Sequence, residues 1–297
     1  MLKEPKLTTR TFLSTSLYLG NSTRNGNYIF PYWQNKLDLI FSDFSRYNEI
    51  IMNGALGTGK TVVANLCASY ILYTTMIIEN PQEYFNLAKD DKIVVLFLND
   101  NSDKTSTKPK IFEYIESSPW FMKNGTLTDK EYISNNNIVV KCSDTVKEDE
   151  KVIACILDEA NYMENTDKLF TIYKNIKKQM EILFPIVGKC FLVSGSRNKY
   201  DLIHMYIGAG ISNTTLHIND TQWVIKPQGT FGTKRFKVMI PTNSELQPII
   251  LNDEDIESIN NYIEQGYKSL DVPLELKWDF DLDVYKALNC FAGITLK

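Results

Sequence analysis

The residues GALGTGKT at positions 54–61 constrain this chain more than any other feature. They fit the pattern G-x-x-x-x-G-K-[ST] and follow the apolar run at 50–52, where a strand would end and a helix begin. In such a loop, backbone N–H groups and the positive end of the helix hold nucleotide phosphates. Lys60 would neutralise phosphate charge, and Thr61 would place its hydroxyl on Mg²⁺. The residues predicted to contact the nucleotide here are Gly54, Gly57, Thr58, Gly59, Lys60 and Thr61.

Apolar runs recur along the chain in the way that strands buried on both faces require. They cover residues 49–53, 93–99, 137–142, 152–157 and 190–194. Helical patterns at 60–79 and 169–184 lie among them. This alternation predicts an α/β fold with a mainly parallel central sheet flanked by helices. Later in the chain we expect strand-like pieces at 214–218, 223–225 and 236–240, and then a helix at 253–264.

Three parts are expected along the chain. Residues 1–27 are polar with weak periodicity and are predicted to form an N-terminal arm. Residues 28–245 would form the P-loop core. Residues 246–297 would form a small lid or linker subdomain.

A second strand brings carboxylates to the phosphate loop. The apolar run at 152–157 ends in Asp158 and Glu159, and open α/β sheets bind ligands at the carboxyl ends of their strands. Asp158 is predicted to hold Mg²⁺, and Glu159 to orient or deprotonate the water that attacks the γ-phosphate. Paired acids at this place favour hydrolysis over binding alone, although a strand ending in two solvated acids would read the same.

Two further stretches are candidates from their chemistry. Gln34, in the run FPYWQ, carries an amide that suits the edge of adenine, and the ring of Trp33 could stack on the base. The strand-like run at 190–194 leads into Ser194, Gly195 and Ser196, whose hydroxyls could sense the γ-phosphate and couple its loss to movement. A buried aromatic helix start and an ordinary strand-to-loop turn would explain these two stretches equally well.

Composition limits the possible partners. The 297 residues carry a net charge of -4, so the chain has no overall basic field that would draw it to nucleic acid. No apolar run approaches the roughly 20 residues that cross a bilayer, which predicts an intracellular protein with no membrane contact. The five cysteines are scattered without a C-x-x-C pair, so a thiolate metal site is not expected.

Taken in order, these elements resemble the ATPase domain of the large terminase subunit of tailed double-stranded DNA bacteriophages. The segment LDEANYM at 157–163 is similar to that family's Walker B segment, and Ser194-Gly195-Ser196 to its coupling motif. The run PYWQ resembles its adenine-reading Q motif, and FAGI near the end resembles the stretch before the nuclease. The resemblance covers roughly residues 30–294.

The resemblance implies a RecA-like P-loop ATPase that uses ATP and Mg²⁺ to move double-stranded DNA into a procapsid. It also implies the portal protein and the small terminase subunit as partners, a ring of identical subunits, typically five, and a location in the host cytoplasm at the procapsid portal. Large terminases continue into a nuclease, whereas this sequence stops at Lys297, so no DNA cleavage is expected of these residues.

The second departure from the family concerns the arginine finger, a basic residue that reaches the γ-phosphate. The variable positions 55–58 of the loop hold no basic residue, so a finger acting from this loop is excluded. A finger supplied across a ring interface could be one of four residues: Lys147, Lys151, Arg197 or Arg235.

Two other functions remain compatible with the sequence. A helicase-type P-loop ATPase is suggested by the Asp-Glu-Ala-Asn segment that begins at Asp158. A nucleotide-gated capsid assembly subunit would bind ATP and turn it over very little.

Overall fold

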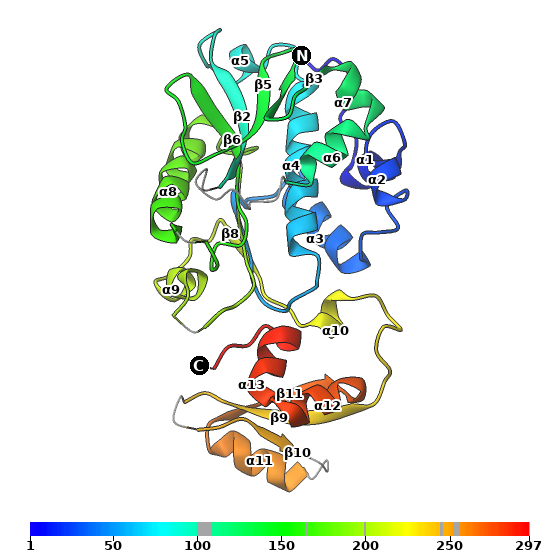
Figure 1. The fold of residues 1–297 in the computed structure, drawn as a ribbon, viewed down its shortest axis with the longest axis vertical. Coiled ribbons are helices and arrows are strands. Elements are labelled where there is room, and N and C mark those ends of the chain that lie inside the picture. The colour runs from blue at the N-terminus through cyan, green and yellow to red at the C-terminus, as the bar shows by residue number, and fades with distance from the viewer. Residues whose placement is uncertain (100–108, 164, 199, 244–245, 252–255, 297) are drawn as a thin grey trace.

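The structure is a computed structural model that describes residues 1–99, 109–163, 165–198, 200–243, 246–251 and 256–296. Figure 1 shows a larger body around a twisted sheet and a smaller body below it. We call residues 1–226 the core domain and residues 231–296 the small domain. No helix in the described ranges combines the length and apolar character that crossing a membrane requires.

The core domain is built on a sheet of eight strands in the order β3-β4-β5-β2-β6-β7-β1-β8. From β5 to β8 every neighbouring pair is parallel, and β3 and β4 add an antiparallel hairpin at one edge. The strands are β1 (Glu49–Met52), β2 (Lys92–Leu98), β3 (Gly125–Leu127), β4 (Glu131–Ser134), β5 (Ile138–Ser143), β6 (Glu150–Leu157), β7 (Lys189–Val193) and β8 (Thr215–Ile218).

The five strands expected from the apolar runs are all present, because continuous apolar stretches can be buried only where helices cover both faces of a sheet. β1 and β7 are buried at every residue. The piece expected at 223–225 is not a strand but part of a short helix, α10 (Gln222–Ile225), which begins directly after Thr221. Three apolar residues were too few to distinguish the two states.

Helices cover both faces of this sheet. In Figure 1, α4 and α3 lie on one face, and α8 and α9 lie on the other. α4 is buried nearly all round, as its uniform apolar pattern predicted. The helices of the core domain are α1 (Thr9–Ser14), α2 (Gly20–Thr23), α3 (Pro31–Phe41), α4 (Lys60–Met76), α5 (Pro81–Tyr84), α6 (Ile111–Glu116), α7 (Pro119–Lys123), α8 (Thr166–Leu183), α9 (Leu202–Gly208) and α10 (Gln222–Ile225).

The first 27 residues pack against the core through several buried side chains and do not form a free arm. Phe12 and Leu19 are fully buried, and the ring of Phe12 stacks on Tyr73 of α4 at a centroid distance of 4.9 Å. Tyr70 donates its hydroxyl to the carbonyl of Leu7 at 2.6 Å. α1 and α2 are too short to show a helical period, which is why the sequence suggested an unpacked segment.

The small domain has its own three-stranded antiparallel sheet, with β9 between β10 and β11. The boundary expected at residue 245 lies outside the described residues, between β9 and β10, and would cut this sheet. β9 therefore belongs with the residues that follow it, and the change of domain comes after α10. The elements are β9 (Arg235–Pro241), β10 (Ile249–Leu251), α11 (Ile256–Glu264), β11 (Tyr267–Pro273), η1 (Leu274–Leu276), α12 (Lys277–Leu282), α13 (Val284–Ala287) and η2 (Leu288–Ala292).

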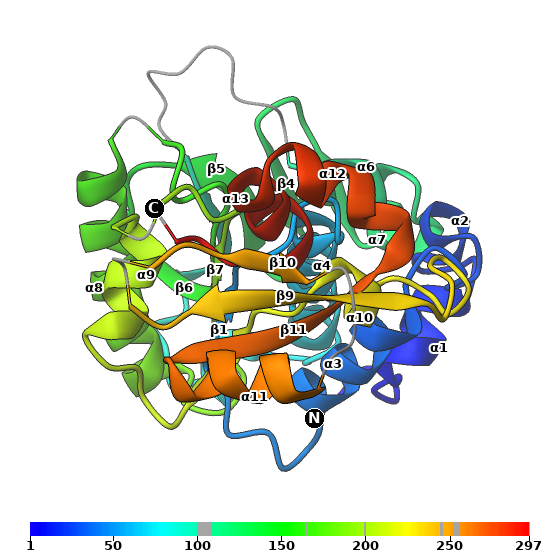
Figure 2. The ribbon, with the colours of Figure 1, turned by 90° about the horizontal axis from the view of Figure 1, so that it is seen from below.

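The core of the small domain is separate from that of the core domain. Phe236 of β9 packs edge-on against Phe280 of α12, and Val238 and Val272 are fully buried beside them. Figure 2 shows the three strands side by side, with α11 along one edge and α12 and α13 beyond the other.

Candidate nucleotide-binding site

The phosphate loop joins the end of β1 to the start of α4, as the sequence predicted. Gly57 and Gly59 have φ values of +64° and +88°, a region that glycine enters without steric cost. Gly59 is the residue directly before α4, so the loop turns its backbone into the helix N-terminus. Among the described residues, Gly57, Thr58 and Gly59 make no hydrogen bond through their backbone N–H groups. Such N–H groups at a helix start can bind an anion.

The ammonium group of Lys60 lies over this loop. It donates to the carbonyl of Ala55 at 2.6 Å and to that of Gly54 at 3.2 Å. Burial lowers the pKa of Lys60 to about 8, and the charges of Glu159 and Asp158 act in the opposite direction. The side chain is therefore still mostly charged at neutral pH and is placed to meet phosphate oxygens.

Thr61 and Asp158 bring the two motifs together. The Thr61 hydroxyl donates to Asp158 Oδ1 at 3.1 Å, and the N–H of Glu159 donates to the same oxygen at 3.0 Å. Burial, followed by the charge of Glu159, raises the pKa of Asp158 to about 6 against the opposing effects of Thr61 and Lys60. This contact arises because β1 and β6 run parallel, with β7 between them, so their carboxyl ends meet at one edge of the sheet.

The oxygen pair of Thr61 and Asp158 fits a magnesium ion. Mg²⁺ prefers oxygen ligands and in nucleotide sites is bound by one or two protein oxygens together with phosphate. Within the described ranges, no cluster of three or more His, Cys, Asp or Glu side chains forms an all-protein metal cage. These donors would hold Mg²⁺ together with a bound nucleotide.

Glu159 sits at a strained turn. It is exposed and has a φ of +53°, which is uncommon for any residue other than glycine. Directly after it, the N–H of Ala160 donates to the carbonyl of Val193 at 3.1 Å. This hydrogen bond attaches the turn to the last residue of β7. The carboxylate of Glu159 is thus held out at the same sheet edge as Thr61 and Asp158. Strain of this kind is often found at functional sites.

The segment Ser194–Ser196 is tied to the residues that follow Glu159. The Asn161 N–H donates to Ser194 Oγ at 3.1 Å, and the Asn161 amide donates to the carbonyl of Gly195 at 2.8 Å. The Tyr162 hydroxyl donates to the carbonyl of Ser196 at 3.2 Å. The Ser196 hydroxyl is buried and makes no hydrogen bond with the described residues. A displacement at Glu159 would therefore reach this segment directly.

Trp33 and Gln34 both make hydrogen bonds to backbone carbonyls. The Trp33 ring is buried and donates its Nε1–H to the carbonyl of Thr58 at 2.6 Å, so it supports the phosphate loop. The Gln34 amide donates to the carbonyls of Gly26 and Ile29, each at 3.4 Å. The structure thus places Gln34 against the turn before α3 and does not bring its amide to the loop. Adenine recognition by this residue stays a prediction.

A cavity of about 190 Å³ opens beside the phosphate loop. Its walls come from the segment before α3, from the loop and from the first turns of α4, and residues that the sequence did not single out form much of them. The short hydrophobic run Tyr28-Ile29-Phe30 was the signal that could have indicated it. The lining residues are Tyr28, Ile29, Phe30, Trp33, Gly57, Thr58, Gly59, Val62, Val63 and Leu66.

The four finger candidates are scattered. Lys147 lies just before β6 and Lys151 is its second residue, both at the opposite end from Asp158, and Lys151 is paired with Asp91 at 3.6 Å. Arg235 begins β9 in the small domain and donates to the carbonyl of Gly232. Arg197 follows Ser196 at the sheet edge that carries the site, where its N–H donates to Asp201 at 2.9 Å. Which of them acts as a finger stays a prediction.

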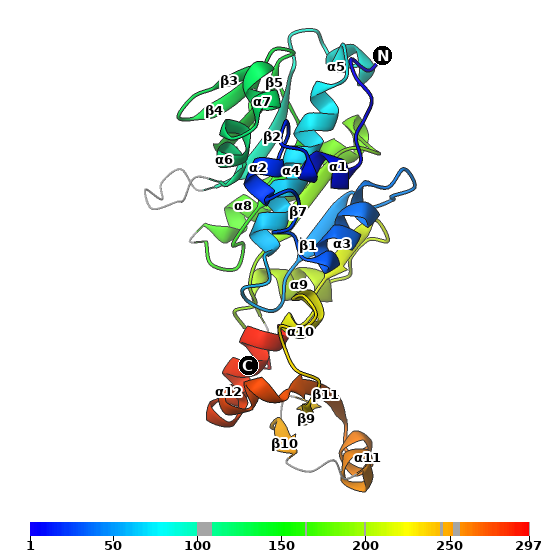
Figure 3. The same cartoon turned by 90° about the vertical axis from the view of Figure 1, so that its right-hand side faces the viewer.

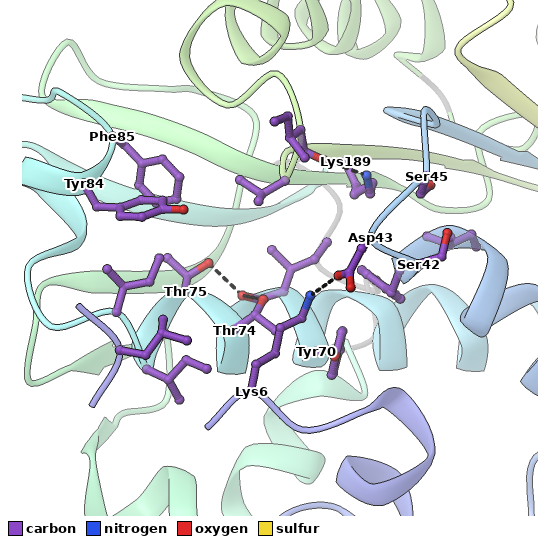
Figure 4. Close-up of a pocket in the computed structure, with 18 residues that line it drawn as sticks. Lys6, Ser42, Asp43, Ser45, Tyr70, Thr74, Thr75, Tyr84, Phe85 and Lys189 are labelled. Atoms are coloured by element: carbon purple, nitrogen blue, oxygen red, sulfur yellow. Dashed lines mark hydrogen bonds and ion pairs between the residues drawn. The ribbon is translucent and has the colours of Figure 1, made fainter. Parts of the chain in front are cut away.

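A second cavity, of about 260 Å³, lies away from the phosphate loop. Figure 4 shows its wall, with Lys6 beside Asp43 at 3.6 Å and with Tyr70, Thr74 and Thr75 from the last turns of α4. The loop joins α4 at Lys60, and a rise of about 1.5 Å per residue separates the two ends by about 20 Å. This cavity therefore takes no part in the nucleotide site.

One family model identifies a P-loop domain in this chain. A family model described as "Uncharacterized protein MJ0330, N-terminal P-loop domain" matches residues 38–231, more than half of the chain. Among solved structures, the crystal structure of the HK97 bacteriophage large terminase is similar, with a TM-score of 0.48 and 13% sequence identity. That similarity covers 72% of this chain and 43% of the terminase chain. No curated protein matches.

Proposed function

The chain belongs to the family of the N-terminal P-loop domain of uncharacterized protein MJ0330, and on that premise we propose that it binds ATP with Mg²⁺ and hydrolyses it. Its fold is that of an α/β P-loop NTPase. The observation that carries the proposal is the 3.1 Å hydrogen bond between Thr61 and Asp158, beside the buried ammonium of Lys60. This contact joins the end of the phosphate loop to the end of β6, so the two sequence motifs form one site.

Each of these residues has a defined part in the proposed reaction. Lys60 binds phosphate oxygens, and its charge offsets the charge that develops as the γ-phosphate leaves. Thr61 and Asp158 would hold Mg²⁺, which would supply positive charge against the nucleotide phosphates. Glu159 orients the attacking water and accepts its proton. Its exposed carboxylate at the sheet edge can reach a water that approaches from solvent.

The proposal extends to the use of the energy. We infer that hydrolysis drives translocation of double-stranded DNA, as in the large terminase ATPases that residues 30–294 resemble. The link from Glu159 through Asn161 to the segment Ser194–Ser196 supports this inference, since it offers a path from the γ-phosphate to a moving element. The proposed partners are a portal protein, a small terminase subunit and identical subunits in a ring, one of which supplies the finger. The proposed location is the procapsid portal in the host cytoplasm.

Phosphate release from Mg²⁺ and ATP tests the hydrolysis. Glu159→Gln should lower turnover by about 100-fold or more, because it removes the proton acceptor, while nucleotide binding survives. Glu264→Gln, an exposed glutamate on α11, is the matched control and should behave as the wild type. Equal turnover in Glu159→Gln and wild type would remove the role given to Glu159.

The same assay with added nucleic acid tests the coupling. Stimulation by duplex DNA supports the translocation motor. Stimulation by single strands alone would favour a helicase-type ATPase, and binding of ATP with negligible turnover under all conditions would favour a nucleotide-gated assembly subunit.

A further inference from the structure

The end of the small domain returns to the phosphate loop. Figure 1 shows the last helices directly below the loop between β1 and α4, and Figure 3 shows from the side that this contact and α10 join the two bodies. The N–H of Leu56 donates to the carbonyl of Cys290 at 2.8 Å. On the other side of the same residue, Gln222 of α10 donates its amide to the carbonyl of Leu56 at 2.8 Å. Leu56 is thus held through its backbone from two directions.

The closest approach is between two glycine backbones. Gly293, just after η2, has a φ of +68°, and a Cβ added to it would lie 2.4 Å from the Cα of Gly54 and 2.5 Å from the N of Ala55. Real Cβ atoms essentially never come this close to backbone atoms. No side chain could rotate away to make room, so any larger residue at position 293 would push on the phosphate loop.

The same short segment also touches the coupling segment. The Asn289 amide donates to the carbonyl of Ser196 at 3.1 Å and to the Thr295 hydroxyl at 2.9 Å. Residues 289–293 therefore contact both parts of the site that respond to a γ-phosphate. We call residues 289–293 the loop clamp.

The loop clamp holds only the first half of the phosphate loop. Its contacts are with Gly54, Ala55 and Leu56, whereas the N–H groups of Gly57, Thr58 and Gly59 make no hydrogen bond with the described residues. The half that would cradle phosphate is thus left open, and the half that precedes it is fixed. A contact that positions the loop must leave the phosphate-binding N–H groups free, as this one does. A contact that blocked nucleotide binding would cover them.

We propose that the loop clamp positions the phosphate loop for nucleotide, so that nucleotide binding and the docking of the small domain stabilise each other. The inference rests on the proposed nucleotide binding and adds a regulating element to that site. Because coupling between two sites is reciprocal, weakening the clamp must weaken nucleotide binding, and binding nucleotide must tighten the clamp.

A pair of glycine variants tests the first half of this statement. Gly293→Ala should weaken binding of a fluorescent ATP analogue by about tenfold, within the usual range for coupled sites. Gly229→Ala is the matched control, because Gly229 has a φ of +87° and nothing within 4 Å of an added Cβ. It should stay within about twofold of wild type. Equal binding by the two variants would overturn the clamp.

Hydrogen exchange on the unmodified chain tests the second half and needs no variant to fold. Adding a non-hydrolysable ATP analogue with Mg²⁺ should slow exchange at residues 284–296 by severalfold. Unchanged exchange there, in a chain shown to bind the analogue, would overturn the coupling. A chain that binds no nucleotide would instead refute the proposed function itself, so the two failures are distinguishable.

Discussion

The two ends of β1 differ in how completely the nearby polar groups are hydrogen-bonded. At its start, the carboxylate of Glu49 is fully buried and accepts hydrogen bonds from four side chains: Tyr173, Lys177, Tyr206 and Thr215. At its other end, the site holds a buried lysine over loop carbonyls, the half-buried carboxylate of Asp158 with a raised pKa, and a serine hydroxyl with no partner among the described residues.

The start of β1 therefore contributes to stability, and its end contributes to the proposed nucleotide site. Burial alone would lower the pKa of Lys177, but its hydrogen bond to Glu49 and the charge of Glu49 raise it instead. The cluster around Glu49 is therefore satisfied within the fold, and it ties β1 to α8, α9 and β8. At the other end, the N–H groups of Gly57, Thr58 and Gly59 make no hydrogen bond with the described residues, and nucleotide phosphates would satisfy them.

Breaking the satisfied end should have the larger effect on stability. Glu49→Gln leaves the half-buried ammonium of Lys177 without its charge partner and should lower the free energy of unfolding by about 3 kcal/mol. Denaturant unfolding measures this, with Glu264→Gln as the exposed control. Nucleotide affinity of the folded protein should change little, because Glu49 lies at the far end of β1 from the loop. A large loss of affinity with unchanged stability would reverse the comparison.

The pKa of Asp158 predicts a pH effect at the functional end. Its folded pKa of about 6 lies above the ordinary value of 3.8, so the folded chain keeps a proton that the unfolded chain has lost between these two values. Without nucleotide, stability should therefore fall as the pH rises from about 4 to about 6, by about 2 kcal/mol from this group. Asp158→Asn should remove that part of the pH dependence. Parallel stability curves for the variant and the wild type would contradict the assignment.

The smallest effect is expected at Ser196. Its buried hydroxyl makes no hydrogen bond with the described residues, so Ser196→Ala should raise the free energy of unfolding by about 1 kcal/mol. Ser194→Ala is the matched variant, and it should lower stability by about 1 kcal/mol, because it leaves the N–H of Asn161 without its acceptor. If both variants change the free energy of unfolding in the same direction, the Ser196 hydroxyl does make a stabilising hydrogen bond.

The sequence was a good guide where signals were local. The five buried strands and the meeting of Thr61 with Asp158 follow from apolar runs and from the rule that parallel strands share an edge. The packing of Phe12 against Tyr73 and the pairing of β9 with β11 depend on distant parts of the chain. No local pattern predicts such contacts.

Two outcomes at the site had no readable signal. The hydrogen bonds from the Gln34 amide to the carbonyls of Gly26 and Ile29 depend on how the turn before α3 folds. Gly293 is one glycine among several, and only its contact with Gly54 shows why a side chain is excluded there. The spacing of residues in the sequence predicts neither the direction of the Gln34 amide nor the contact of Gly293 with Gly54.

The place of β1 in the sheet has a consequence for the order in which the protein is made. Glu49 pairs with Cys190 on one side and with Thr215 on the other, so β1 gains both neighbours long after it leaves the ribosome. The contact of Leu56 with Cys290 comes later still. Such non-local pairings form slowly, and an unpaired strand is prone to aggregate during synthesis. The phosphate-binding segment therefore lacks some of its contacts until Cys290 has been translated, more than 200 residues after Leu56.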